Sequence, residues 1–216
     1  YKYYEKPVIL LIDEYDVPLQ TAYVKGYYDE AIDFLKSFYG ATFKDNPYLQ
    51  KTVLTGVSRI AKESIFSGMN NLNVYTIMDN EFADDFGITS KEMEKVISDF
   101  NIEEDREEIK KWYDGYKIGN VEGIYNPWSI LNYLNKRELR PYWVNTSSND
   151  LIKMTLKKSN SIKEKMIRLL NDEPVEVTID LETIIVGIEE KEENIWGLML
   201  QTGYLKVEEV VDLIKG

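Results

Sequence analysis

Residues 8–19, VILLIDEYDVPL, constrain the fold of this chain more than any other stretch. Five aliphatic residues, 8–12, are followed at once by carboxylates at Asp13, Glu14 and Asp16. The apolar run is short and does not alternate with polar residues, which is typical of a strand buried on both faces in a parallel sheet. Parallel sheets bind ligands beyond the carboxyl ends of their strands. The stretch therefore predicts an inner strand that carries acidic side chains to a ligand-binding edge.

A helix and a second strand are expected next. Apolar residues recur at helical spacing between Tyr27 and Phe43, with Ala31, Leu35 and Phe38 on one face. Asn46-Pro47 breaks this helix, and residues 51–55 read as a short strand. The order strand, helix, strand predicts a parallel crossover unit. Residues 73–78, NVYTIM, are a candidate for a third strand.

Helix signals dominate from residue 80 onward. Thr89-x-x-Glu92 forms a predicted capping box, and Asn126 before Pro127 predicts another helix start. Further helices are expected over 104–116, 150–156, 161–170 (with a capping box at Ser161) and 194–202, and a small strand over 175–179. The predicted organisation is an α/β part, residues 1–79, followed by a mainly α-helical, lid-like part, residues 80–216.

Composition excludes several classes of site. The 216 residues include no cysteine and no histidine, so zinc sites of the usual kind, disulfides, thiol nucleophiles and Ser-His triads are all absent. The net charge of −12 predicts no direct binding of a nucleic-acid backbone, which depends on clustered Lys and Arg. No apolar run approaches the ~18 residues of a membrane helix, and no signal peptide is recognised, so a cytoplasmic protein without membrane contact is expected.

The apolar strand followed by Asp13 and Glu14 matches the Walker B pattern of nucleotide hydrolases. In phosphoryl-transfer sites the first acid holds Mg²⁺ and a neighbouring acid can orient or deprotonate the attacking water. A solvated Asp-Glu turn after a hydrophobic strand is the alternative interpretation. Asp16 and Pro18 fit a plain turn as well as a site.

The second strand ends in residues that favour the nucleotide interpretation. Thr55, Ser58 and Arg59 follow it, at the place where nucleotide switches carry a residue that senses the γ-phosphate. Arg59 is the only arginine in the first 105 residues, and its planar fork suits a phosphate. A plain surface arginine after a strand is the alternative.

The phosphate-binding loop of such enzymes is not found. No G-x-x-x-x-G-K-[ST] motif occurs in the 216 residues. Seven residues precede the first strand, too few for a phosphate-loop strand and its helix. Two alternatives remain: the loop lies upstream in a longer protein, or the interpretation as a P-loop NTPase is wrong.

Several longer segments, in order, resemble the predicted AAA-ATPase-like family of bacteria and archaea. They are LLIDEYDVPL, LTGVSRIAKESIFSGMNNL, WYDGYKIG, YNPWSILNYL and YWVNTSSNDLI, spread over residues 8 to 152. The resemblance implies a P-loop core of the additional-strand type with a helical lid, often followed by a PD-(D/E)XK nuclease-like domain. It also implies ATP and Mg²⁺ as ligands. By position, Asp13 would be the Mg²⁺-side acid, Glu14 the water-activating acid, and Arg59, with Thr55 or Ser58, the sensor.

Three hypotheses follow from these residues. The first is a Mg²⁺–ATP-dependent switch core, incomplete in this chain and inactive alone, that acts on a protein partner or a fused nuclease-like domain. The second is a non-catalytic interaction module with a degenerate ATPase-like fold. The third is a metal-dependent nuclease in which Asp13, Glu14 and Asp16 bind Mg²⁺ directly.

Overall fold

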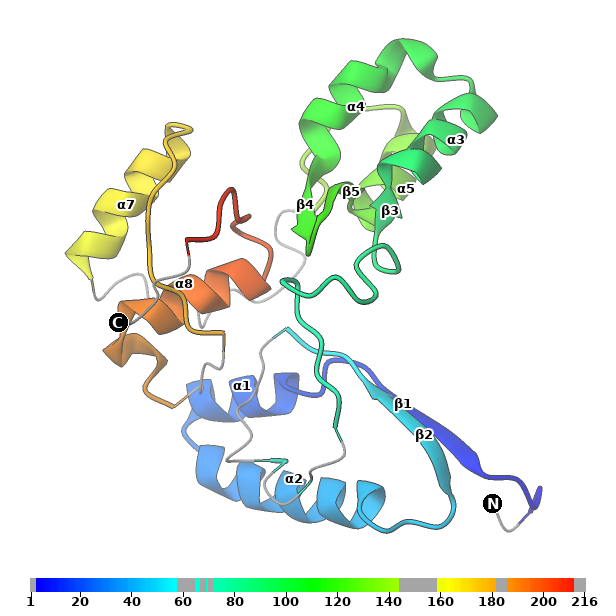
Figure 1. Ribbon diagram of the computed structural model, residues 1–216, viewed down its shortest axis with the longest axis vertical. Coiled ribbons are helices and arrows are strands. Elements are labelled where there is room, and N and C mark those ends of the chain that lie inside the picture. Colours follow the sequence, from blue (N-terminus) through cyan, green and yellow to red (C-terminus); the bar gives the residue numbers. More distant parts are fainter. Residues whose placement is uncertain are drawn as a thin grey trace. The chain divides into compact units, whose positions relative to one another are not determined.

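The chain forms two compact units (Figure 1). One comprises Tyr1–Leu72 with Asn149–Thr202, and the other Asn73–Ser148 with Gly203–Gly216. The computed structural model describes residues 3–57, 65–66, 69, 72–143, 159–181 and 186–211. The predicted division of the chain at residue 80 stays a prediction. The helix expected over 150–156 lies outside the described residues.

The first unit contains the predicted parallel crossover. Strand β1 (Val8–Ile12) runs parallel to β2 (Leu49–Leu54), and helices α1 (Val17–Lys25) and α2 (Tyr28–Phe43) connect them (Figure 1). The fold is therefore mixed α/β with a parallel pair, as expected. Helix α1 was not predicted. It begins with proline in its first turn and ends at Gly26, whose φ of 80° gives the left-handed cap that glycine adopts easily.

Helix α2 turns inward a face that only partly matches the one expected: Leu35 is buried and Ala31 packs against the core, but Phe38 is not buried. Its buried residues are Ile32, Leu35, Tyr39 and Phe43, and they form the core of this unit together with Leu19 and Ile65. Phe38, which was expected to be buried, is 49% exposed and stacks on Phe34 at the surface. Both stripes of the helix are aromatic-rich, so spacing alone could not select the one that packs.

The prediction that β1 is buried on both faces is wrong. Leu10 and Ile12 pack against the helical core, whereas Ile9 and Leu11 are 57% and 72% exposed. The register pairs Leu11 with Val53, which is also 42% exposed. The parallel pair thus has one covered face and one open apolar face within the described part of the chain.

The later described residues of the first unit include three further helices. Helix α7 (Asn160–Leu170), the 3-10 helix η2 (Ile188–Glu190) and α8 (Glu192–Gln201) follow in order. Ile188 and Leu198 pack with Tyr23 of α1, which joins this region to the crossover.

Two expectations for this region are wrong. Helix α7 is capped by Ser159, whose hydroxyl accepts from the backbone N–H of Ile162, and not by Ser161, which contacts Glu192 instead. Residues 175–179 form no strand. No helix in the described ranges is long and apolar enough to cross a membrane.

The second unit combines helices with a small antiparallel sheet. Its elements are β3 (Ile88–Thr89), α3 (Ser90–Phe100), η1 (Glu103–Asp105), α4 (Arg106–Tyr113), β4 (Asp114–Ile118), β5 (Val121–Tyr125) and α5 (Pro127–Lys136). The strand order is β3-β5-β4. The predicted helices and both predicted caps are confirmed: Thr89 and Glu92 form a capping box, and Asn126 caps α5.

The sheet of the second unit was not foreseen. Helix α4 ends at Tyr113, before the predicted end at 116, because Asp114 begins the β4–β5 hairpin. The strand predicted over 73–78 is wrong. Thr76 instead starts a turn in which its N–H and hydroxyl donate to Asp79 Oδ2, at 2.7 and 2.8 Å. A short polar side chain that forms hydrogen bonds within its own turn in this way competes with strand pairing.

Candidate functional site

The carboxyl ends of β1 and β2 lie side by side because the two strands are parallel. The pairing continues past the strands: Thr55 N donates to Ile12 O at 2.9 Å, and Tyr15 N donates to Thr55 O at 3.0 Å. These two bonds hold the turn after β1 against the first residue after β2. The edge at which open parallel sheets bind ligands therefore carries residues 13–16 and 55–57.

The structure brings together two of the predicted site residues, Asp13 and Thr55. The Thr55 hydroxyl donates to Asp13 Oδ1, and the backbone N–H of Glu14 donates to the same oxygen at 3.0 Å. Asp13 is solvent-exposed, so its carboxylate is oriented by two donors while it faces water. An oriented and accessible carboxylate is a suitable ligand for a hydrated Mg²⁺ ion.

Glu14 lies next to this pair in an uncommon backbone conformation. It is exposed, and its φ is 52°, in the left-handed region that side chains other than glycine rarely adopt. Such conformations cost about 1–3 kcal/mol and cluster at functional sites. Glu14 is thus an exposed acid directly after Asp13 at this edge of the sheet.

Ser58 and Arg59, the other predicted site residues, lie outside the described residues. Their proposed roles at the sensor position stay predictions. The last described residue before them is Val57, which is exposed at the sheet edge.

Asp16 behaves differently from the two exposed acids. It is 0% exposed, Oδ2 accepts from Gln20 Nε2 at 2.7 Å, and Oδ1 accepts from the backbone N–H of Val57 at 3.4 Å. Burial and the charge of Asp16 both raise the pKa of Tyr39 on α2. Sequence reasoning treated Asp16 as a turn residue or an exposed metal ligand, and so missed its place in the interior.

Gly56 is a sequence signal for the burial of Asp16, but its meaning is clear only once the fold is known. Gly56 follows β2, and a Cβ atom there would lie 2.6 Å from Asp16 Oδ1 and 2.7 Å from the Tyr15 ring. The glycine thus permits the loop after β2 to lie directly on the buried carboxylate.

The three carboxylates do not form one metal cage. Among the described residues there is no group of three or more acidic side chains placed to hold a metal ion. Asp16 points inward, to Gln20 and Val57, while Asp13 and Glu14 face solvent. This arrangement counts against the nuclease hypothesis, which needs direct binding of Mg²⁺ by all three.

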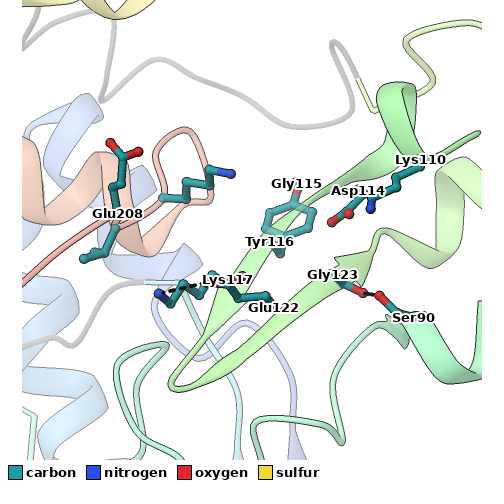
Figure 2. Close-up of a pocket in the computed structure, with 11 residues that line it drawn as sticks. Ser90, Lys110, Asp114, Gly115, Tyr116, Lys117, Glu122, Gly123 and Glu208 are labelled. Carbon is teal, nitrogen blue, oxygen red and sulfur yellow. Dashed lines mark hydrogen bonds and ion pairs between the residues drawn. The ribbon is translucent and has the colours of Figure 1, made fainter. Parts of the chain in front are cut away.

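The second unit contains a separate polar pocket of about 520 Å³. Its lining includes Lys110, Asp114, Lys117, Glu122 and Glu208. Figure 2 shows two of its internal contacts: Lys117 Nζ pairs with Glu122 Oε1 at 3.2 Å, and the hydroxyl of Ser90 donates to the carbonyl of Gly123 at 2.9 Å. Charges of both signs line the pocket, so it selects no single class of ligand.

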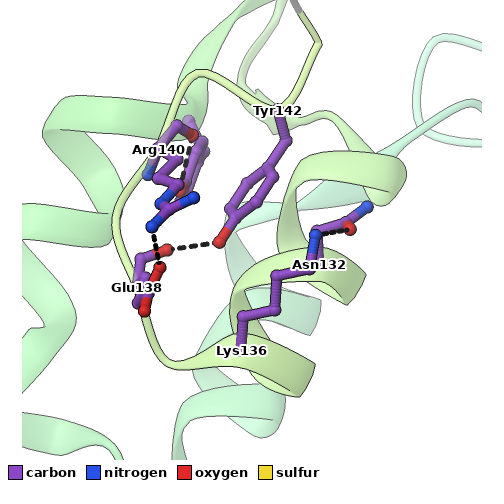
Figure 3. A network of polar contacts seen from close by, with 6 residues as sticks. Asn132, Lys136, Glu138, Arg140 and Tyr142 are labelled. Atoms are coloured by element: carbon purple, nitrogen blue, oxygen red, sulfur yellow. Dashed lines mark hydrogen bonds and ion pairs between the residues drawn. The ribbon is translucent and has the colours of Figure 1, made fainter.

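Tyr113, in the WYDGY segment, contributes to the core of the second unit. Tyr113 is 7% exposed, and its hydroxyl donates to the carbonyl of Arg140 and accepts from that residue's N–H, both at 3.0 Å. Figure 3 shows the neighbouring contacts: Arg140 pairs with Glu138 at 2.6 Å, and Tyr142 donates to the Glu138 carbonyl at 2.7 Å. This network binds residues 138–142 to the helical core of the second unit.

Comparison with known proteins finds a family resemblance in the first part of the chain. Residues 1–66 match the family model described as predicted AAA-ATPase. The match confirms the resemblance for the region that contains β1, β2 and the carboxylates between them. It does not extend to the second unit, where the resemblance rests on the segments quoted above.

Sequence comparison also finds a related protein. An Azotobacter chroococcum mcd 1 protein, described as an uncharacterized protein in the vnfD 5′ region, is 28% identical over 204 residues. The alignment covers 94% of this chain but 37% of that protein, so the chain spans little more than a third of the relative's length. No solved structure shows a significant match to the chain.

Proposed function

We propose that the AAA-ATPase-like region of this chain is part of a Mg²⁺–ATP-binding and hydrolysing switch core in a larger protein. The observation that carries the proposal is the meeting of Asp13 with Thr55 at the carboxyl edge of a parallel strand pair, with Glu14 exposed beside them. In P-loop NTPases an acid in this position lies on the metal side of the nucleotide.

The chemistry of the donors fits the proposed ligands. Mg²⁺ binds hard oxygen atoms and commonly takes one or two carboxylates, with water and phosphate oxygens in the remaining positions. Asp13 supplies such a carboxylate, held by Thr55 and by the Glu14 amide. When bound, the metal would neutralise phosphate charge during transfer. Within this chain, Asp13 would hold the metal ion in position.

Glu14 is the residue that we expect to act on water. Its carboxylate is exposed one residue beyond Asp13, and a carboxylate in this place can orient an attacking water or accept its proton. Arg59 would respond to the γ-phosphate from the loop after β2, as the resemblance implies. These two roles are proposals for the longer protein.

The open face of the strand pair supports the idea of a larger core. Parallel sheets are stable when both faces are covered. Here Ile9, Leu11 and Val53 are exposed on one face. We infer that further strands or helices of the longer polypeptide cover this face. A phosphate-binding loop, which has no motif in these 216 residues, would belong to the same additional part.

The decisive test is ATP binding and turnover by the full-length protein, with Glu14→Gln as the principal variant. We expect ATP binding to persist and turnover to fall by about 100-fold or more, because general-base steps contribute roughly 10²–10⁴-fold. Glu30→Gln, a change at an exposed acid on α2, is the matched control and should retain wild-type turnover. Unchanged turnover in Glu14→Gln would remove this residue from the proposed role.

The same assay separates the hypotheses. Arg59→Ala should bind ATP but lose the nucleotide-dependent change of shape. A full-length protein that binds no ATP would favour the non-catalytic interaction module, because the first unit would then keep only the shape of an ATPase core.

A further inference from the structure

We propose that Asp16 is a positioning residue that joins the turn carrying Asp13 and Glu14 to the loop that follows β2. The inference about the loop rests on contacts within this chain. Its consequence for turnover rests on the proposed ATPase function.

Burial gives the first argument. Aspartate is almost never fully buried unless its charge is compensated by hydrogen bonds or a counter-charge. Asp16 is 0% exposed and uses its two oxygens in two directions, toward Gln20 on α1 and toward the N–H of Val57. One carboxylate therefore links the first turn of a helix to a loop 41 positions away in the chain.

Close packing gives the second argument. The Cβ position of Gly56 lies 2.6 Å from Asp16 Oδ1, so only a residue without a side chain lets the backbone approach this far. The ring of Tyr15, which packs on Phe66 at 5.5 Å between ring centroids, lies 2.7 Å from the same Cβ position. Gly56 is thus in close contact with both an aromatic ring and a buried carboxylate.

Position along the chain gives the third argument. Asp16 follows Glu14 by two residues, and Val57 directly precedes Ser58 and Arg59. The bond between Asp16 and Val57 sets the point at which the loop leaves the sheet. Asp16 therefore connects the turn that carries the two exposed acids to the residue just before the predicted sensor residues.

The bond itself can be tested without nucleotide, by amide hydrogen exchange on the 216-residue chain. The wild-type Val57 amide should be protected although its residue is exposed, and Asp16→Ala should accelerate its exchange by about tenfold or more, as expected for loss of a bond to a charged acceptor. Asp16→Asn, which keeps an acceptor oxygen, should restore much of the protection. Gln20→Ala is the matched control and should leave the Val57 amide unchanged.

Two results would overturn the proposal at this stage. One is an unprotected Val57 amide in the wild-type chain, a measurement that needs no variant to fold. The other is an equal acceleration of the β2 amides and Val57 in Asp16→Ala, because that would mean a general loss of stability.

The catalytic consequence is tested separately, in the full-length protein under conditions where all variants are folded. Asp16→Ala should lower kcat by about tenfold or more while the affinity for ATP changes little. The reason is that the variant loses the hydrogen bond that positions Val57 relative to the turn with the two exposed acids. Asp16→Asn should recover most of kcat. Wild-type kcat in Asp16→Ala would refute the catalytic coupling. An inactive wild type would refute the proposed function and leave the exchange result standing.

Discussion

At the residue scale, Gly56 decides how closely the two loops of the candidate site approach each other. A Cβ atom at this position would meet Asp16 and the Tyr15 ring at less than 3.0 Å. Neither neighbour can retreat freely, because Asp16 is buried and bonded and Tyr15 packs on Phe66. Gly40, in the interior of α2, has no atom within 4 Å of its Cβ position apart from the local backbone and adjoining residues, and offers a direct comparison.

Opposite effects are therefore expected from the same chemical change at two glycines. Gly56→Ala should lower the free energy of unfolding by about 1–3 kcal/mol, because the added methyl group overpacks a closed contact. Gly40→Ala should raise it by about 0.5–1 kcal/mol, because alanine loses less backbone entropy in a helix. Chemical denaturation of the 216-residue chain measures both. Gly56→Ala as stable as the wild type would contradict the close approach.

At the element scale, buried tyrosines attach helices to their neighbours in the second unit. Tyr133 of α5 is 3% exposed, and its hydroxyl donates to Asp105 of η1. Burial, followed by the hydrogen bond and the charge of Asp105, raises the pKa of Tyr133 to about 12 from the ordinary value of 10.0. The contact between α5 and η1 therefore depends on a phenol that must stay protonated.

Stability should consequently fall at alkaline pH. The folded-state pKa is the higher one, so the stabilisation from Tyr133 is complete below about pH 10 and is lost as the pH rises toward 12. Across this window Tyr133→Phe should reduce the slope of unfolding free energy against pH by up to about 1.4 kcal/mol per pH unit. Asp105→Asn should reduce this slope less than Tyr133→Phe does, because Tyr133 stays buried and burial is the main cause of its raised pKa. Identical slopes for wild type and Tyr133→Phe in denaturant titrations would disprove this assignment.

The elements also show where pattern reading succeeds. Thr89 with Glu92 and Asn126 before Pro127 mark helix starts correctly, because a cap is satisfied by atoms three residues away. The β4–β5 hairpin escaped prediction because its strands continue the aromatic spacing of α4 past Tyr113. Hairpin pairing is decided by a partner strand, and periodicity within one segment carries no information about that partner.

At the scale of the whole molecule, the open face of the β1–β2 pair is the feature that most needs a partner. Leu11 is 72% exposed on this face, while Leu10 packs into the helical core. If further elements of the longer protein cover the face, burial of Leu11 should differ between the 216-residue chain and that protein.

A pair of substitutions tests this expectation. Leu11→Gln should change the unfolding free energy of the 216-residue chain by less than about 0.5 kcal/mol, as for other exposed sites. In the full-length protein it should cost about 2 kcal/mol or more, as for a buried leucine. Leu10→Gln, on the covered face, is the control that should destabilise both. If Leu11→Gln leaves the unfolding free energy of both proteins nearly unchanged, no further element covers Leu11 in the full-length protein.

The amino-acid sequence by itself determined the order of β1, α2 and β2, the caps of α3 and α5, and the place of Asp13 and Glu14 after an apolar strand. These features depend on neighbours along the chain, so local spacing is enough to reveal them. Tertiary structure alone decided which stripe of α2 packs, which face of β1 stays open, and that Asp16 lies inside while Asp13 meets Thr55 outside. Each of those outcomes depends on a contact with a segment distant in sequence, which no local pattern encodes.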